Sequence, residues 1–206
     1  MIHSPFRMNT LFLDLASHQQ SVALVRDAKT VASIKVDSKV GEGQLLPLIE
    51  GMLSKENITF KDLDRIASTT GPGGFMSLRV GIALANALSD SLQIPLAGVH
   101  LSDLWHARAN SNLWIHSTKK EFVFVRGFGE GAASWQEPTL EHIKDLQDMI
   151  THDTQYTGEL IESQQAVLPR LKKAEQLGSF EEVLPELLAT LTFEQKSLEP
   201  WYGRGA

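Results

Sequence analysis

The chain has 206 residues, a formal net charge of −6 and no cysteine. The lack of cysteine excludes disulfides, thiol catalysis and cysteine-ligated zinc, and it favours a reducing, cytoplasmic location. No cluster of Lys and Arg is present to neutralise phosphates, which argues against unaided nucleic-acid binding. No apolar stretch reaches the length of a membrane span. The composition therefore predicts a soluble globular protein with one large or two small domains.

The N-terminal part begins with three short apolar runs. Residues 1–7 are too short and polar for a signal peptide, so we treat them as an extension outside the fold. Apolar runs then follow at 11–15, 21–25 and 31–36, with polar turns between them. This spacing predicts three sequential strands in an antiparallel meander.

Helices and strands alternate after this meander. The apolar periodicity predicts helices over 44–53, 75–92 and 102–110 and strands over 65–69 and 95–99. From the pattern alone, this order indicates a mixed α/β sheet covered by helices.

A glycine-rich turn, Gly71-Pro72-Gly73-Gly74, joins the strand at 65–69 to the helix at 75–92. Backbone N–H groups at a helix start can bind phosphate. However, no lysine follows these glycines, and Met76 stands where a G-x-G-x-x-G motif needs its third glycine. The sequence thus favours a structural turn.

The second half carries weaker signals. We expect a hairpin of strands at 112–117 and 121–128, followed by helices over 140–150 and 180–191. Gly127, Gly129 and Gly131 mark a loop that is a minor candidate for nucleotide binding, since bare glycine-rich turns are common.

The glycine turn and the helix after it resemble the GPGSFTGLRIG signature of the bacterial TsaB (YeaZ) family. The residues that match are Gly71, Pro72, Gly73, Phe75, Leu78, Arg79 and Gly81. The sequence departs from the signature at Gly74, Met76 and Ser77. Similar matches to the family occur at 13–24, 43–49, 94–99 and 199–204, so the resemblance covers 8–110 and the tail.

The resemblance implies an α/β fold of the actin/Hsp70/sugar-kinase (ASKHA) type, a mixed sheet with flanking helices. It places a first domain at 8–110 and a smaller, degenerate second domain at 111–195. The tail at 196–206, including Trp201 and Tyr202, is expected to pack back on the first domain.

The function that the resemblance implies is that of a non-catalytic subunit in the synthesis of N6-threonylcarbamoyladenosine (t6A) on tRNA. The implied partners are a TsaD-like transferase and a TsaE-like ATPase, with a homodimer when the chain is alone. Transfer RNA is expected to bind only through the complex, and no membrane is involved. This chain is expected to hold no cofactor, whereas ATP and metal belong to the partner subunits.

The expected partner interface lies on the first two helices of the first domain, as in that family. Its residues are Gln44, Leu45, Leu48, Ile49, Met52, Val80, Ala83, Leu84 and Ala87. Their apolar character exceeds that of ordinary solvated surfaces. The alternative is that both helices simply cover the sheet. Gly71, Pro72, Gly73, Phe75 and Arg79 are interpreted as a structural motif.

Asp14 is a weak candidate for cofactor binding, because an acid ends the first strand in ATPases of this superfamily. Here Leu15 and Ala16 follow it, so the glycine that admits phosphate is absent. The alternative is an acid that hydrogen-bonds a neighbouring loop. His100 and His106 are six residues apart and point in different directions on a helix, so we expect surface or cap histidines there and no metal site.

Two other functions stay open at this stage. The chain could be an ATP-dependent kinase or ATPase of the same superfamily, which would bind nucleotide by itself. It could also be a generic dimerising interaction module of this fold, which would associate with itself and bind no TsaD-like protein.

Overall fold

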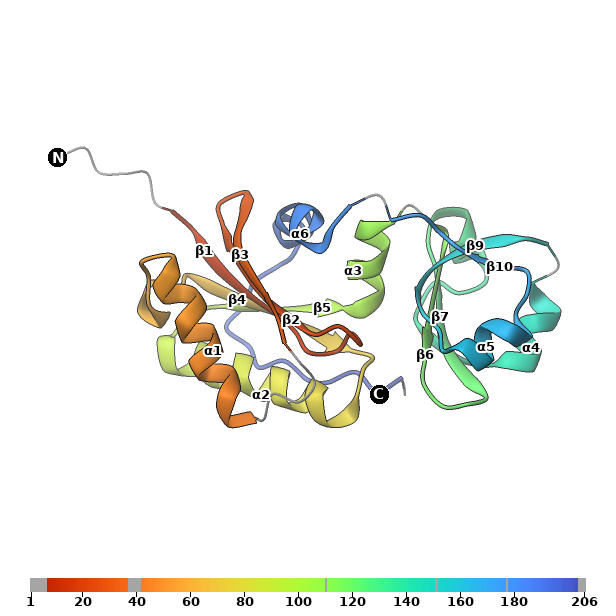
Figure 1. Ribbon diagram of the computed structural model, residues 1–206, viewed down its shortest axis with the longest axis horizontal. Helices are drawn as coiled ribbons and strands as arrows, with labels where there is room; N and C mark the ends of the chain where they lie inside the picture. Colours follow the sequence, from red (N-terminus) through yellow and green to blue (C-terminus); the bar gives the residue numbers. More distant parts are fainter. Residues whose placement is uncertain (1–6, 37–41, 110, 151, 177, 204–206) are drawn as a thin grey trace. The chain divides into compact units, whose positions relative to one another are not determined.

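The computed structural model describes residues 7–36, 42–109, 111–150, 152–176 and 178–203. The chain divides into two units, the first formed by Met1–His100 and Phe180–Pro200 and the second by Leu101–Ser179 and Trp201–Ala206 (Figure 1). Among the described residues, no helix has the length and apolar character needed to cross a bilayer.

The first unit contains a five-stranded sheet in the order β3-β2-β1-β4-β5. Its strands are β1 (Asn9–Asp14), β2 (Ser21–Arg26), β3 (Lys29–Lys35), β4 (Arg65–Gly71) and β5 (Leu96–His100). The first three strands pair antiparallel, whereas β4 pairs parallel with both β1 and β5. The predicted meander and the parallel strands after it are therefore present.

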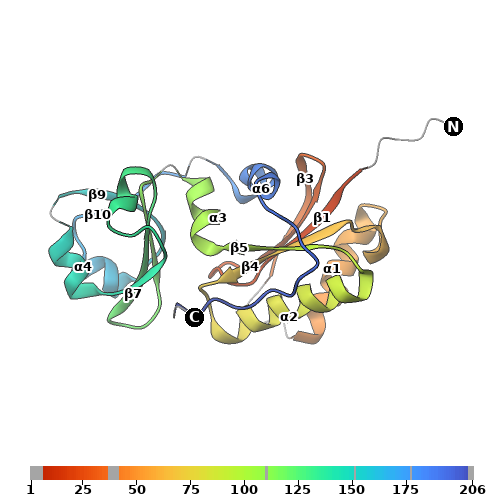
Figure 2. The ribbon, with the colours of Figure 1, turned by 180° about the vertical axis from the view of Figure 1, so that it is seen from behind.

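Helices cover both faces of this sheet. Helices α1 (Glu42–Lys55) and α2 (Phe75–Leu92) lie side by side on one face (Figures 1 and 2). On the other face, α6 (Phe180–Ala189) contacts β2 and β3, and the ring centroids of Phe180 and Phe12 lie 5.5 Å apart. Because both faces are covered, β1 is buried at every residue.

The segment after α6 closes the β5 edge of the sheet (Figure 2). Glu194 forms an antiparallel bridge with Leu96, with N···O distances of 2.8 Å in both directions. Further along, the Leu198 N–H donates to the Asn86 side chain on α2 at 2.8 Å. The bonds between Glu194 and Leu96 satisfy edge groups of β5 that would otherwise be free to pair with another strand.

The second unit has its own five-stranded mixed sheet, in the order β10-β9-β6-β7-β8. Its elements are α3 (Leu101–Arg108), β6 (Leu113–Ser117), β7 (Phe122–Gly127), the 3₁₀ helix η2 (Gly129–Ala133), β8 (Thr139–His142), α4 (Ile143–Met149), β9 (Thr154–Glu159), α5 (Glu162–Val167) and β10 (Leu171–Lys173). Ile115, Val125 and Leu146 lie at the centre of its core, fully buried.

Three expectations for the second half differ from the structure. The helix expected at 140–150 begins only at Ile143, because Thr139–His142 pairs with β7 as strand β8. Residues 180–189 were expected in the second domain, but α6 belongs to the first unit, where Phe180 packs on β1. The tail follows the first unit only to Pro200, and the Trp201 ring lies 5.1 Å from that of Phe124 within the second unit. Residues 1–6 and Arg204 lie outside the described residues.

The glycine turn before α2 packs directly on the turn after β1. A Cβ atom built on Gly73 would lie 2.6 Å from the backbone oxygen of Ala16, closer than such atoms can approach. Gly71 has a φ of 124°, a conformation that favours glycine. The two turns can therefore meet only if these two positions carry no side chain.

Replacement of this glycine should destabilise the fold. We expect Gly73→Ala to lower the free energy of unfolding by about 1–3 kcal/mol, because the added methyl group must displace the backbone of Ala16. Urea unfolding followed by circular dichroism measures this change.

Gly51 in α1 provides the matched control, since a Cβ built there meets nothing within 4 Å. Gly51→Ala should be neutral or raise stability by up to about 1 kcal/mol, because alanine is the better helix former. Equal stability of the Gly73→Ala variant and the natural chain would contradict the close contact.

Candidate functional site

Asp14 ends β1 with its side chain turned into its own loop. The carboxylate is buried, and its Oδ1 accepts hydrogen bonds from the backbone N–H groups of Ala16 and Ser17, each at 3.1 Å. The Thr69 hydroxyl on β4 donates to the same oxygen at 3.1 Å, and the Ser17 hydroxyl donates to Oδ2. The chain itself thus supplies four donors to this carboxylate.

Burial controls the protonation of this group. Removal from water raises the pKa of Asp14 above its ordinary value, and the hydrogen bonds from Ser17, Ala16 and Thr69 oppose this rise without cancelling it. After protonation, Oδ2 can donate to the Ser17 hydroxyl, which also accepts hydrogen bonds. Asp14 therefore acts in the first unit as a link between the turn after β1 and strand β4.

The α1 and α2 residues expected at a partner interface fall into two groups. Leu45, Ile49 and Met52 are buried in the chain's own core, with at most 4% of their surface exposed, so they are not available to a partner. The sequence could not separate them from Leu48, Val80, Ala83, Leu84 and Ala87, because all of these side chains are apolar. We define the α1–α2 surface by the accessible remainder: Gln44, Ala83 and Ala87 are exposed, and Leu48, Val80 and Leu84 are half-buried.

The residues of the glycine motif that match the family signature also differ in their exposure to solvent. Gly71 and Pro72 are buried in the turn. By contrast, Phe75 is 56% exposed and Arg79 is exposed, and the Arg79 guanidinium lies 5.2 Å from the centroid of the Phe75 ring. Met76 beside them is 63% exposed. The interpretation as a structural motif therefore fits Gly71, Pro72 and Gly73 but not the two exposed side chains.

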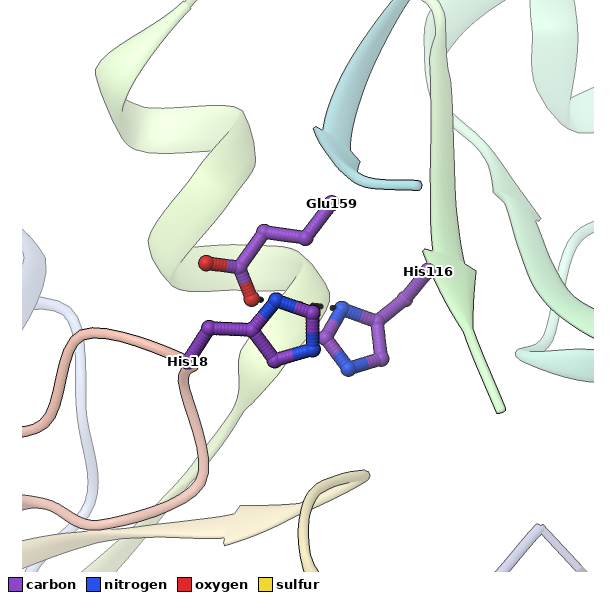
Figure 3. Close-up of side chains that lie close together, drawn as sticks. All are labelled: His18, His116 and Glu159. Atoms are coloured by element: carbon purple, nitrogen blue, oxygen red, sulfur yellow. Dashed lines mark ion pairs between the residues drawn. The ribbon is translucent and has the colours of Figure 1, made fainter. Parts of the chain in front are cut away.

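The histidines of the second unit have specific contacts. The His106 ring stacks on Phe128 with 3.9 Å between centroids. His142 caps α4, because its Nδ1 accepts the Lys144 N–H at 3.2 Å. His116 was not among the residues singled out from the sequence. It is buried on β6, with its Nδ1 3.6 Å from the Glu159 carboxylate at the end of β9 (Figure 3). Its place in an otherwise apolar strand was the available signal for burial.

Comparison with known proteins shows which proteins this chain is similar to. Residues 38–125 match the family model described as TsaD, tRNA N6-adenosine threonylcarbamoyltransferase. The TsaB protein of Buchnera aphidicola subsp. Schizaphis graminum is 30% identical over 62% of this chain and 59% of its own length. That of Buchnera aphidicola subsp. Acyrthosiphon pisum is 25% identical over 92% and 94%. These comparisons show that the chain is similar to proteins of the TsaB (YeaZ) family.

A solved structure supports the same fold. A Pseudomonas aeruginosa protein described as similar to the peptidase YeaZ superposes with a TM-score of 0.69 and 19% identity, over 96% of this chain and 100% of that one. The ASKHA-type fold expected from the sequence is thereby confirmed. The sequence alignment with the first of the Buchnera relatives spans 59% of that protein, less than two thirds of its length.

The raised pKa of Asp14 leads to a prediction about how the stability of this chain depends on pH. The folded chain takes up the Asp14 proton at a higher pH than the unfolded chain does. Stability from this group is therefore full below the ordinary Asp pKa of 3.8 and is lost as the pH rises through the folded value.

Asp14→Asn removes this titration and keeps the size of the side chain. We expect the free energy of unfolding of the natural chain, minus that of the variant, to increase as the pH falls from 7 toward 4. Urea unfolding at several pH values measures the difference. A decrease over the same range would show instead that the hydrogen bonds to the charged carboxylate outweigh its burial.

Proposed function

We propose that this chain is a non-catalytic scaffold or activator subunit for t6A modification of tRNA, acting in the cytoplasm. Its curated relatives are named tRNA threonylcarbamoyladenosine biosynthesis protein TsaB, which supports the pathway. The non-catalytic part of the proposal depends mainly on one observation, the arrangement of Asp14.

The contacts of Asp14 oppose phosphate or metal chemistry at the end of β1. A catalytic acid at this position needs carboxylate oxygens that face a bound ion or phosphate. Here the Oδ1 and Oδ2 oxygens already accept four hydrogen bonds from Ala16, Ser17 and Thr69. In addition, Ala16 occupies the space against Gly73, the position at which a phosphate would approach the glycine turn. We therefore propose that this chain holds no nucleotide or metal cofactor.

The proposed binding surface for a TsaD-like transferase is the α1–α2 surface. Val80, Ala83, Leu84 and Ala87 recur at helical spacing along α2, and Ala83 and Ala87 are exposed. Small side chains at these positions let a partner helix approach the α2 backbone closely. Leu48 and Gln44 extend the surface on α1.

The other members of the proposed assembly follow from this role. The TsaD-like partner would carry the metal and the transferase reaction, and a TsaE-like ATPase would join the complex. Without the partner, the same surface would pair two copies of this chain. A chain with a net charge of −6 is a poor ligand for polyanions, so tRNA would bind through the complex.

The test combines chromatography with light scattering. The chain is run alone and after mixing with the TsaD-like protein of the same organism. We expect a heterodimer that replaces any homodimer. Ala83→Glu should weaken this complex at least about tenfold, because a carboxylate buried without a partner costs more than 1.4 kcal/mol.

A matched control distinguishes an effect at the interface from a general effect of the added negative charge. Ala166→Glu introduces the same change at an exposed alanine of α5 in the second unit and should leave binding intact. Circular dichroism must show that the Ala83→Glu variant is folded, which its exposure predicts. The absence of any complex at tens of micromolar would overturn the proposed partner. ATP hydrolysis by the chain alone, lost in Asp14→Asn, would overturn the non-catalytic role in favour of the ATPase alternative.

A further inference from the structure

A hollow of about 350 Å³ opens in the second unit beside the glycine loop of residues 127–131, and the proposed function makes no use of it. Its walls combine an aromatic ring, a thioether and several oxygen-bearing side chains. The residues that matter here are Asn112, Glu130, Ser134, Trp135, Met149 and Thr154.

The glycine loop forms a rigid wall of this hollow. A Cβ atom on Gly127 would lie 1.9 Å from the Gly131 oxygen, and one on Gly131 would lie 2.2 Å from the Asn112 oxygen. The Phe128 N–H also donates to this Asn112 oxygen at 2.9 Å. Because the backbone segments are in direct contact, the wall exists before any ligand binds, which lowers the entropic cost of binding.

The indole of Trp135 is held at the same hollow. Its Nε1–H donates to the Glu141 carboxylate at 3.1 Å, and its backbone oxygen accepts the Gly127 N–H at 2.7 Å. The half-buried ring also packs against the apolar core of the second unit. A fixed indole offers a surface on which a flat or cationic group can stack.

The charged and polar side chains of the hollow determine which kind of flat ligand it favours. Glu130 contributes an exposed carboxylate, and among the described residues that line the hollow none is lysine or arginine. Asn112, Ser134 and Thr154 add oxygen atoms that accept hydrogen bonds. This lining disfavours phosphate-bearing ligands and favours a cation with several N–H donors.

We propose that this hollow binds a guanidinium group presented by an arginine side chain of a protein segment. A guanidinium is planar, so it can stack on the Trp135 indole, and its N–H groups can pair with the Glu130 carboxylate. Lysine has a compact ammonium group and gains less from the ring and the acceptors. The inference is independent of the proposed function, because it concerns the second unit alone.

A second hollow in this unit is a weaker candidate. It measures about 500 Å³ and is lined by residues 147, 148, 150 and 168–171. The described residues that line it include Arg170 and no aromatic side chain. Asp148 supplies a carboxylate, but no ring is available for stacking, and the cationic Arg170 side chain disfavours a second guanidinium.

The test is a titration of the full chain followed by NMR. The probes are the peptide acetyl-Gly-Arg-Gly-amide and the same peptide with citrulline, a neutral isostere of arginine. We expect saturable shifts at the Trp135 indole N–H with the arginine peptide and none with citrulline. Glu130→Gln should weaken binding about fivefold. Trp135→Ala should weaken it about two- to fivefold.

Glu121→Gln is the matched control, because Glu121 is an exposed acid of the same unit outside the hollow. It should leave the affinity unchanged. Glu130 is itself exposed, so its variant keeps the test valid even if Trp135→Ala unfolds. Equal binding of the two peptides, no saturable binding, or equal effects of the two acid variants would overturn the proposal. Binding of free agmatine without binding of the arginine peptide would overturn the protein segment as the source.

Discussion

The arrangement of the first unit depends on the hydrogen bonds that the buried Asp14 carboxylate accepts. This carboxylate joins the turn after β1 to Thr69 on the neighbouring parallel strand, and so it fixes where the polypeptide leaves both strands. Ala16 in that turn then rests against Gly73, and Leu15 against Gly81 of α2. One polar network therefore determines the position at which α2 begins and the face of the sheet that it covers.

The same network is the physical basis of the proposed non-catalytic role of this ASKHA-type fold. In this fold the ends of the parallel strands form a natural place for ligands. Here hydroxyl and backbone N–H groups of the chain donate hydrogen bonds to the Asp14 carboxylate. The Ala16 methyl group lies against Gly73 of the glycine turn. The oxygens of Asp14 are thus engaged in hydrogen bonds within the chain, which is why the proposed function assigns binding to the helix surfaces of the first unit.

The two units differ in what they leave accessible. The first unit presents small and apolar side chains on α2, with Ala83 and Ala87 exposed, which suits contact with another helix. The second unit presents a hollow in which a rigid glycine loop, an indole and a carboxylate meet. Helix packing buries a broad surface, whereas a hollow of this kind selects a single side chain. The two proposed recognition surfaces therefore lie in different units and differ in kind.

The sequence by itself determined the order of strands and helices in the first unit, because apolar periodicity and glycine punctuation are local properties. It also favoured a structural role for the turn at Gly71 over phosphate binding. Only the tertiary structure decided which apolar residues of α1 face the sheet, since Leu45 and Leu48 are indistinguishable until a neighbour buries one of them. It likewise decided that Phe180 belongs with β1, because that contact joins residues 168 positions apart in the chain, and no local pattern encodes it.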